Sequence, residues 1–395
     1  MTDDFWRWYG GIMRLPNWSI GRALGIPIHV HASWFFVFFF VTWTLATGYL
    51  PGVLPGLSSP RYWGMGVVAA LLLFLSVLLH ELGHSYVAQR YKIPIRQITL
   101  FIFGGMAHMG KEPPSPRAEF LIAMAGPIVS LVLGACCIGS VFAAESLLPS
   151  SGIQGFLALG VILAQANLTM GLFNLIPGFP LDGGRALRAG LWAWNRNFDL
   201  ATSQAALVGI GFGLLLGLAG GMLMLGAAVG TIGTGLGTDG GWLMFLGAFL
   251  FVAAHGTRRQ AAMRVSLTRT AVRQVMVQHV VSIMPGLTVQ DAVDQYFVAH
   301  GFGGFPVCEE GRVLGMITVD DIQAFPKGLW TWRVVREVMR PATPDLLIPS
   351  DWSVMQAMER MTQSGWDRLA VMENEVMVGL ITRSAIGHFL RLKNT

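Results

Sequence analysis

The sequence is short of charged residues. Asp, Glu, Lys and Arg make up 12% of its 395 residues, whereas they make up about a quarter of an ordinary soluble domain. Because charged side chains cover the water-facing surface of a soluble protein, this shortage excludes a simple soluble enzyme. The chain also lacks a Gly-X-Y period and dense basic patches, which excludes a collagen-like chain and direct nucleic-acid binding. Apolar residues are abundant instead, at 53% with a mean hydropathy of +0.56, and they exclude intrinsic disorder.

Cysteine is also scarce. The chain has three, of which Cys136 and Cys137 are adjacent in an apolar run and Cys308 lies far away in a more polar region. Three cysteines at this spacing cannot form a disulfide framework. We therefore expect free, buried thiols.

Long apolar runs fill the chain up to about residue 256. A helix needs about 20 apolar residues to cross a hydrocarbon core of about 30 Å, and about six runs approach this length. They predict a polytopic α-helical membrane domain over residues 31–256. The runs are Ser33 to Leu50, Trp63 to Tyr91, Ala118 to Ala144, Ile153 to Leu175, Ala205 to Ala228 and Trp242 to His255.

Residues 1–30 precede the first run and are rich in tryptophan. Asp3 and Asp4 stand where a signal peptide would have a basic start. Trp6, Trp8 and Trp18 are typical of the aromatic belt at a membrane surface. We expect residues 1–30 to form an N-terminal interfacial segment.

Basic residues gather in alternate loops between the apolar runs. Because basic loops stay in the cytoplasm and the number of spans is even, we expect both termini on the cytoplasmic side of the cell membrane. The loops of the opposite side contain only Arg61. The cytoplasmic set is Arg7, Arg14, Arg22, Arg90, Lys92, Arg96, Lys111, Arg117, Arg185, Arg188, Arg196, Arg258, Arg259 and Arg264.

The part of the chain after residue 256 contains a repeat. A Val-Met pair at 275 and a Gly-Met-Ile-Thr sequence at 315–318 recur as Val-Met at 338 and Gly-Leu-Ile-Thr at 379–382. This arrangement resembles a tandem pair of CBS domains, which are soluble α/β units. We place the two domains at residues 271–328 and 332–392, after a linker over residues 257–270.

The strongest chemical pattern is His80-Glu81-Leu82-Gly83-His84, near the end of the second apolar run. Residues four apart share one face of a helix, so His80 and His84 can bind one zinc ion, while Glu81 can act as general base. Chance would produce this pattern in roughly one chain in two hundred of this composition. The alternative is that both histidines merely cap the cytoplasmic end of the helix, near Arg90 and Lys92.

A catalytic zinc site needs a third protein ligand, and Asp182 is the best candidate. It lies in the segment from Asn174 to Arg185, where two prolines and three glycines prevent a regular helix. The predicted topology puts this segment on the same side of the membrane as the two histidines. The alternative is that Asp182 only caps a turn or a helix before Gly183.

The two motifs together resemble the intramembrane zinc metalloproteases of the site-2 protease family, in the branch with a C-terminal CBS pair. Ala125-Gly126-Pro127 and Gly104-Gly105 extend the match, and no PDZ insertion is visible. The resemblance implies that His80, His84 and Asp182 are the zinc ligands and Glu81 the general base. It implies that Asn174 holds the substrate backbone or the developing oxyanion, whereas a hydrogen bond within the broken helix is the plainer role.

The stretch from Pro94 to Met109 suits a helix poorly. Its apolar residues before Gly104-Gly105 fit a short β-hairpin that dips into the membrane, and an unpaired edge there could bind substrate by strand addition. An amphipathic surface loop is the equal alternative. His108 fits a polar loop residue better than a fourth ligand, which would close the site.

The CBS resemblance also implies a nucleotide site. In CBS pairs that bind adenosine nucleotides, a Thr and an Asp three residues later contact the ribose and the phosphates, and Thr318 and Asp321 match them. The second repeat has Thr382 but Ala385 at the matching position. The pair therefore binds ATP or AMP through one half-site, or it serves as a dimerisation or docking module.

Two functions follow from these patterns. The leading one is a zinc endopeptidase that performs regulated proteolysis of a membrane-embedded or membrane-tethered protein. The resemblance implies substrates such as anti-sigma factors or sigma-factor precursors, and a homodimer through the CBS domains. The alternative is a CBS-regulated channel or transporter, although ion pathways spread polar groups along several spans, whereas here they concentrate at the two motifs.

Overall fold

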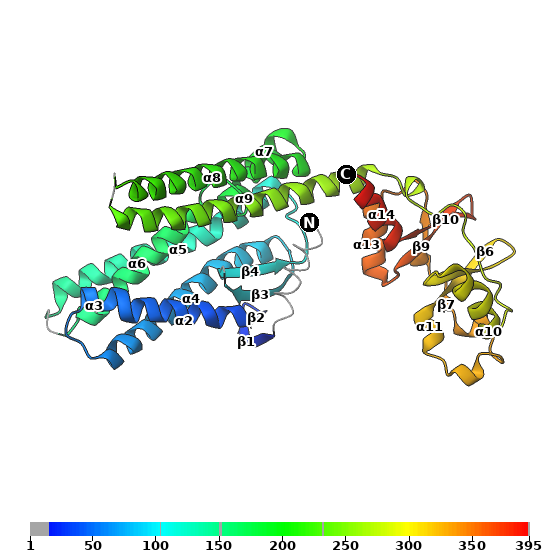
Figure 1. The fold of residues 1–395 in the computed structure, drawn as a ribbon, viewed down its shortest axis with the longest axis horizontal. Helices are drawn as coiled ribbons and strands as arrows, with labels where there is room; N and C mark the ends of the chain where they lie inside the picture. Colours follow the sequence, from blue (N-terminus) through cyan, green and yellow to red (C-terminus); the bar gives the residue numbers. More distant parts are fainter. Residues whose placement is uncertain (1–15, 103, 150–151, 231–232, 394–395) are drawn as a thin grey trace. The chain divides into compact units, whose positions relative to one another are not determined.

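The structure is a computed structural model that describes residues 16–102, 104–149, 152–230 and 233–393 (Figure 1). It divides into two compact units, Met1–Arg259 and Gln260–Thr395, each of which is described by itself. The first half of the predicted interfacial segment, residues 1–15 with Trp6 and Trp8, lies outside the described residues.

The first unit is built from long helices, six of which are long and apolar enough to cross a membrane. This confirms the predicted polytopic membrane fold for the part of the chain that the structure describes. Several helices are longer than the apolar runs that predicted them, because a helix can continue past the hydrocarbon core into polar residues. Residues 257–269, expected as a linker, are thus the last turns of the sixth helix. The helices are α2 (Ala32–Thr44, continued by a π-helical stretch Leu45–Tyr49 and by α3, Leu50–Val53), α4 (Ser59–Arg90), α5 (Pro116–Leu147), α6 (Gln154–Asn174), the shorter α7 (Asp182–Asn195), α8 (Phe198–Ala228) and α9 (Thr234–Arg269).

A four-stranded sheet accompanies these helices. Its order is β1-β2-β3-β4, formed by β1 (Asn17–Ala23), β2 (Ile26–His31), β3 (Ile95–Phe101) and β4 (Gly104–Met109). The predicted hairpin is present as the antiparallel pair β3–β4. Residues 17–31, for which the sequence predicted no strands, form β1 and β2, and β2 pairs in parallel with β3 far along the chain. Non-local pairing of this kind leaves no local signal in the sequence. The interfacial location of residues 17–31 stays a prediction.

One face of the sheet packs toward α4. Ile28, Val30, Ile98 and Leu100 alternate along β2 and β3 and are all buried. On β4 the backbone comes so near to α4 that a Cβ atom at Gly105 would lie 2.4 Å from Cγ of Glu81. The sheet therefore lies directly against the helix that carries the HELGH sequence.

Helix α5 packs against α4, α6 and α7. Small residues allow the close approach: a Cβ atom at Gly83 of α4 would lie 2.9 Å from a methyl of Val129, and one at Gly171 of α6 would lie 2.9 Å from Leu131. Two of the three cysteines lie farther along α5. All three are free as predicted, but Cys136 is exposed and the other two are only half-buried. The two on α5 need no protein cover, because an apolar residue of a membrane helix can face lipid; Cys308 lies in the second unit.

The second unit contains the predicted duplication. The unit has two three-stranded sheets, with orders β5-β6-β7 and β10-β9-β8. Strand β7 comes from the second repeat and pairs with β6 of the first. The first segment of repeat 1 packs into repeat 2, because Val277 bridges Leu380 and Val272 shares a buried core with Leu369 and Ile381. The elements are α10 (Val289–Ala292), β5 (Gly304–Glu309), β6 (Arg312–Thr318), α11 (Val319–Gln323), α12 (Val335–Val338), β7 (Arg340–Pro341), β8 (Leu347–Pro349), α13 (Val354–Ser364), β9 (Arg368–Glu373), β10 (Val376–Thr382) and α14 (Arg383–Lys393).

Candidate functional site

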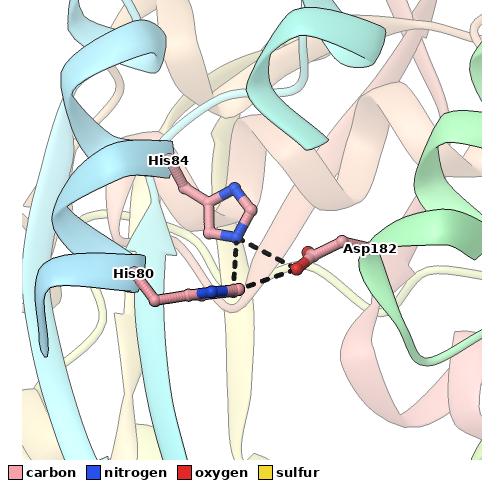
Figure 2. A group of neighbouring side chains, drawn as sticks. All are labelled: His80, His84 and Asp182. Atoms are coloured by element: carbon pink, nitrogen blue, oxygen red, sulfur yellow. Dashed lines mark hydrogen bonds and ion pairs between the residues drawn. The ribbon is translucent and has the colours of Figure 1, made fainter. Parts of the chain in front are cut away.

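His80, His84 and Asp182 come together, although Asp182 lies 102 and 98 residues after the two histidines in the sequence. The two histidines lie one turn apart on α4 with 4% and 3% of their surface exposed, and Asp182 is the first residue of α7. Figure 2 shows the two imidazole rings and the carboxylate pointing at one another. The Nε2 atom of each histidine lies 3.1 Å from Oδ2 of Asp182, and the two Nε2 atoms are 3.1 Å apart.

Helix α5 fixes the orientation of both imidazole rings through contacts to their Nδ1 atoms. Nδ1 of His84 donates to the carbonyl oxygen of Ile122 at 2.6 Å, and Nδ1 of His80 lies 2.8 Å from Oγ of Ser130. With the Nδ1 side of each ring occupied, Nε2 is the nitrogen that faces the carboxylate, which is the arrangement of a metal-binding histidine. The sequence reasoning missed Ser130 and Ile122, although a polar serine at membrane depth was a signal.

Between these two contacts, α5 presents a glycine to the site. A Cβ atom at Gly126 would lie 2.2 Å from Nε2 of His84 and 2.6 Å from Nε2 of His80. No side chain larger than a hydrogen fits there without moving the rings. Gly126 therefore keeps the space between the imidazoles and α5 open.

The loop between α6 and α7 delivers Asp182. Its prolines and glycines end α6 at Asn174, as predicted. Cβ atoms at Gly183 and Gly184 would lie only 2.3 Å from the carbonyl oxygen of Leu175 and 2.4 Å from the carbonyl carbon of Gly178. The double glycine thus lets the start of α7 fold back onto the preceding loop, which fixes the position of Asp182.

This donor set fits a zinc ion. The ligands of a tetrahedral zinc ion with bonds of about 2.0–2.1 Å lie roughly 3.3 Å apart, close to the 3.1 Å separations observed. Two neutral imidazoles and one carboxylate leave one position open, as a catalytic site requires. Within the described residues, this is the one group of three or more His, Cys, Asp or Glu side chains that could hold a metal, and His108 does not belong to it.

The two predicted catalytic residues, Glu81 and Asn174, lie on α4 and α6. Glu81 is half-buried, follows His80 on α4 and packs against Gly105 of β4. Asn174 is the half-buried last residue of α6, immediately before the loop that leads to Asp182. No hydrogen bond among the described residues joins Asn174 to the histidines or to Asp182.

These features define a polytopic membrane protein with a candidate metal centre. It has helices that could span a membrane, a buried His-His-Asp group between them and a duplicated α/β unit. Residues 68–147 and 138–218 match the model of Peptidase family M50, and residues 272–327 and 335–391 match that of the CBS domain. The chain belongs to peptidase family M50 and carries a tandem CBS pair. This confirms the predicted site-2 protease resemblance and, with it, the enzyme class of zinc metallopeptidase.

Relatives match along most of the chain. Zinc metalloprotease MJ0392 of Methanocaldococcus jannaschii is 30% identical over 372 residues, which are 94% of this chain and 95% of that protein. A relative from Synechocystis sp., whose name also includes zinc metalloprotease, is 32% identical over 95% of this chain and 96% of its own length. Among solved structures, the site-2 protease from M. jannaschii is 31% identical, covers 62% of this chain and 95% of that one, and has a TM-score of 0.42.

Proposed function

We propose that this protein is an intramembrane zinc endopeptidase in which His80, His84 and Asp182 hold the metal and Glu81 is the general base. The convergence of the three ligand atoms to 3.1 Å between two membrane-depth elements carries the proposal. Ionisable groups at such depth are costly unless they bind a partner, and a zinc ion is the partner that this donor set fits. Family membership favours this function over the alternative of a CBS-regulated channel or transporter.

The residues divide the chemistry of peptide hydrolysis among them. A bound zinc ion would supply Lewis acidity to the scissile carbonyl and to the attacking water. Glu81 takes a proton from that water and later gives it to the departing nitrogen, so the peptide C–N bond breaks while a C–O bond forms. Asn174 donates an amide hydrogen bond to the substrate backbone or to the developing oxyanion.

Strand β4 is suited to hold the substrate in an extended form. It is an edge of the sheet as described, since it pairs with β3 on one side. Its backbone at Gly105 touches the side chain of Glu81, so a strand added along β4 would run past the general base. A substrate helix hides its peptide bonds in hydrogen bonds, and strand addition would expose one to water.

The substrate is a membrane-embedded or membrane-tethered protein, and its cleavage serves regulated proteolysis. We place the protein in the cell membrane with both termini and the CBS domains in the cytoplasm, because the basic loops alternate in that sense. A homodimer through the CBS pair completes the proposal. Sedimentation of the detergent-solubilised chain tests the dimer, and protease protection of vesicles tests the orientation.

A pair of variants tests the catalytic assignment. We expect His84→Ala to lose zinc, and Glu81→Gln to keep zinc but to lose all cleavage, since the ligands remain and the base is gone. Glu81→Gln also serves as a trap whose bound membrane protein, once identified, becomes the substrate in a purified assay. Glu145→Gln, the same change at an exposed site on α5, is the control. Equal zinc in wild type and His84→Ala, or undiminished cleavage by Glu81→Gln, would overturn the assignment.

We also propose that ATP or AMP binds at Thr318 and Asp321. Both are half-buried at the start of α11, directly after strand β6. In the structure they cap this helix, with Oγ1 of Thr318 donating to Asp321 at 2.6 Å, so a ribose would share these oxygens. Calorimetry of the full chain with each nucleotide at millimolar concentration tests the site. We expect Asp321→Asn to weaken binding; no heat with either nucleotide would contradict the proposal.

A further inference from the structure

Helix α5 carries a buried carboxylate that the proposed chemistry does not use. Glu119 lies in the first turn of α5 and has none of its surface exposed. Its Oε1 atom accepts hydrogen bonds from Nε of Arg185 at 3.1 Å and from a terminal nitrogen of Arg188 at 2.5 Å. Both arginines belong to α7, the helix that begins with Asp182.

The two arginines tie further elements to this carboxylate. The guanidinium of Arg188 lies over the rings of Phe179, in the loop before α7, and Phe198, at the start of α8, at 5.1 and 4.5 Å. Arg185 reaches the sulfur of Met109 at the end of β4 at 3.8 Å. The group formed by Glu119, Arg185 and Arg188 thus connects the beginning of α7 to α5, to β4, to the loop before α7 and to the start of α8.

The face of α5 that carries Glu119 is the face that orients the histidines. Glu119, Ile122, Gly126 and Ser130 are spaced by three, four and four residues, so they line one stripe of the helix. Ile122 and Ser130 hold the two imidazoles, and Gly126 leaves them room. Among the described hydrogen bonds, none joins the third ligand, Asp182, directly to α5. The ion pairs of Glu119 with Arg185 and Arg188 instead tie α5 to α7, the helix that Asp182 begins.

We propose that Glu119 is a positioning residue that sets Asp182 against His80 and His84 by anchoring Arg185 and Arg188. This inference rests on the proposed function, because it takes Asp182 as a metal ligand. Without the Glu119 carboxylate, the two largely buried arginines would lose the ion pairs that compensate their charge, and the first turns of α7 would move to solvate them. The ligand atom of Asp182 would move with them.

Zinc retention of the full-length protein in detergent tests the proposal. We compare wild type, Glu119→Gln, Glu119→Asp and the control Glu145→Gln, measuring the zinc that remains against a graded series of a competing chelator. We expect Glu119→Gln to bind zinc about 10- to 100-fold more weakly, as loss of a group that supports a metal ligand does. Glu119→Asp should recover part of this loss, and Glu145→Gln should match wild type. Once a substrate is in hand, kcat should fall with zinc occupancy while KM stays unchanged.

A second variant separates positioning from folding. Replacing a whole buried ionic group by apolar residues generally preserves stability, whereas removing one partner does not. We therefore expect the triple variant Glu119→Met/Arg185→Met/Arg188→Met to unfold at the wild-type temperature but to bind zinc more weakly than wild type does. Wild-type zinc affinity in this variant or in Glu119→Gln would overturn the role of Glu119. Absence of zinc from wild type itself would instead overturn the proposed function.

Discussion

Replacement of Gly126 by alanine tests the geometry of the site most directly. The added methyl would lie 2.2 and 2.6 Å from the two Nε2 atoms that face Asp182, whereas non-bonded heavy atoms prefer separations of roughly 3.5 Å or more. The overlap of about 1 Å cannot be relieved by α5, which packs against α4, α6 and α7. The rings must therefore move, which displaces the two Nε2 atoms from the positions in which they face Asp182.

The size of the effect follows from this overlap. Forcing an extra methyl into a packed site costs about 1–3 kcal/mol. If the zinc site bears this cost, zinc affinity falls about 5- to 150-fold. Gly139→Ala is the matched control, because Gly139 lies on the same helix with no atom within 4 Å of an added Cβ. Alanine favours a helix over glycine by up to about 1 kcal/mol, so this control should keep both zinc and stability.

The assay is zinc affinity by chelator competition, with thermal unfolding of the zinc-free proteins measured in parallel. We expect Gly126→Ala to lose affinity while its zinc-free form unfolds near the wild-type temperature, because strain that the rings relieve by moving apart is released without the metal. Wild-type affinity in Gly126→Ala would refute the reasoning. So would an equal loss in Gly139→Ala, which would show a general effect of alanine on α5.

Further predictions concern β4 and the CBS unit. Gly105→Ala should reduce cleavage but retain zinc, since its methyl would overlap Glu81 and not the ligands; zinc analysis beside a cleavage assay checks this. Leu369→Ala should destabilise the CBS unit by about 2–5 kcal/mol in denaturant unfolding because the side chain is fully buried, whereas Val376→Ala, 58% exposed, should cost under about 0.5 kcal/mol. Hydrogen bonds from Arg368 hold the pKa of the Asp367 carboxyl below the usual aspartate value. The resulting small stability increment is present above about pH 4 and is lost as pH falls through the lowered pKa, so stability measured from pH 5 to pH 2 should decline less in Arg368→Gln.

Local sequence patterns predict much of the fold of this protein. The apolar runs predict helices because a hydrocarbon core admits little else, and the described helices follow them with longer ends. The duplicated motifs predict the repeats of the second unit. For β1 and β2 the same reasoning fails, because the strand order depends on pairing Ile28 with Ile98, far apart in the sequence.

The candidate site divides in the same way. Spacing puts His80 and His84 on one helical face, and the glycines and prolines around Asp182 predict a broken helix. Nothing in local spacing reveals that Ile122 and Ser130 would hold the rings, since a carbonyl and a hydroxyl become partners only when α5 crosses α4. Likewise, Glu119 is an ordinary helical glutamate until α7 brings Arg185 and Arg188 to it.

The sequence by itself determined whether each part of the chain lies in lipid or in water, and which side-chain atoms are available for chemistry. Charge content decides between lipid and water, and side-chain chemistry decides which residues can bind zinc. Only the tertiary structure decided which of these groups meet, because contact between α4, α5 and α7 depends on packing across long sequence separations. That packing turns two histidines and an aspartate into one cluster with 3.1 Å between its ligand atoms.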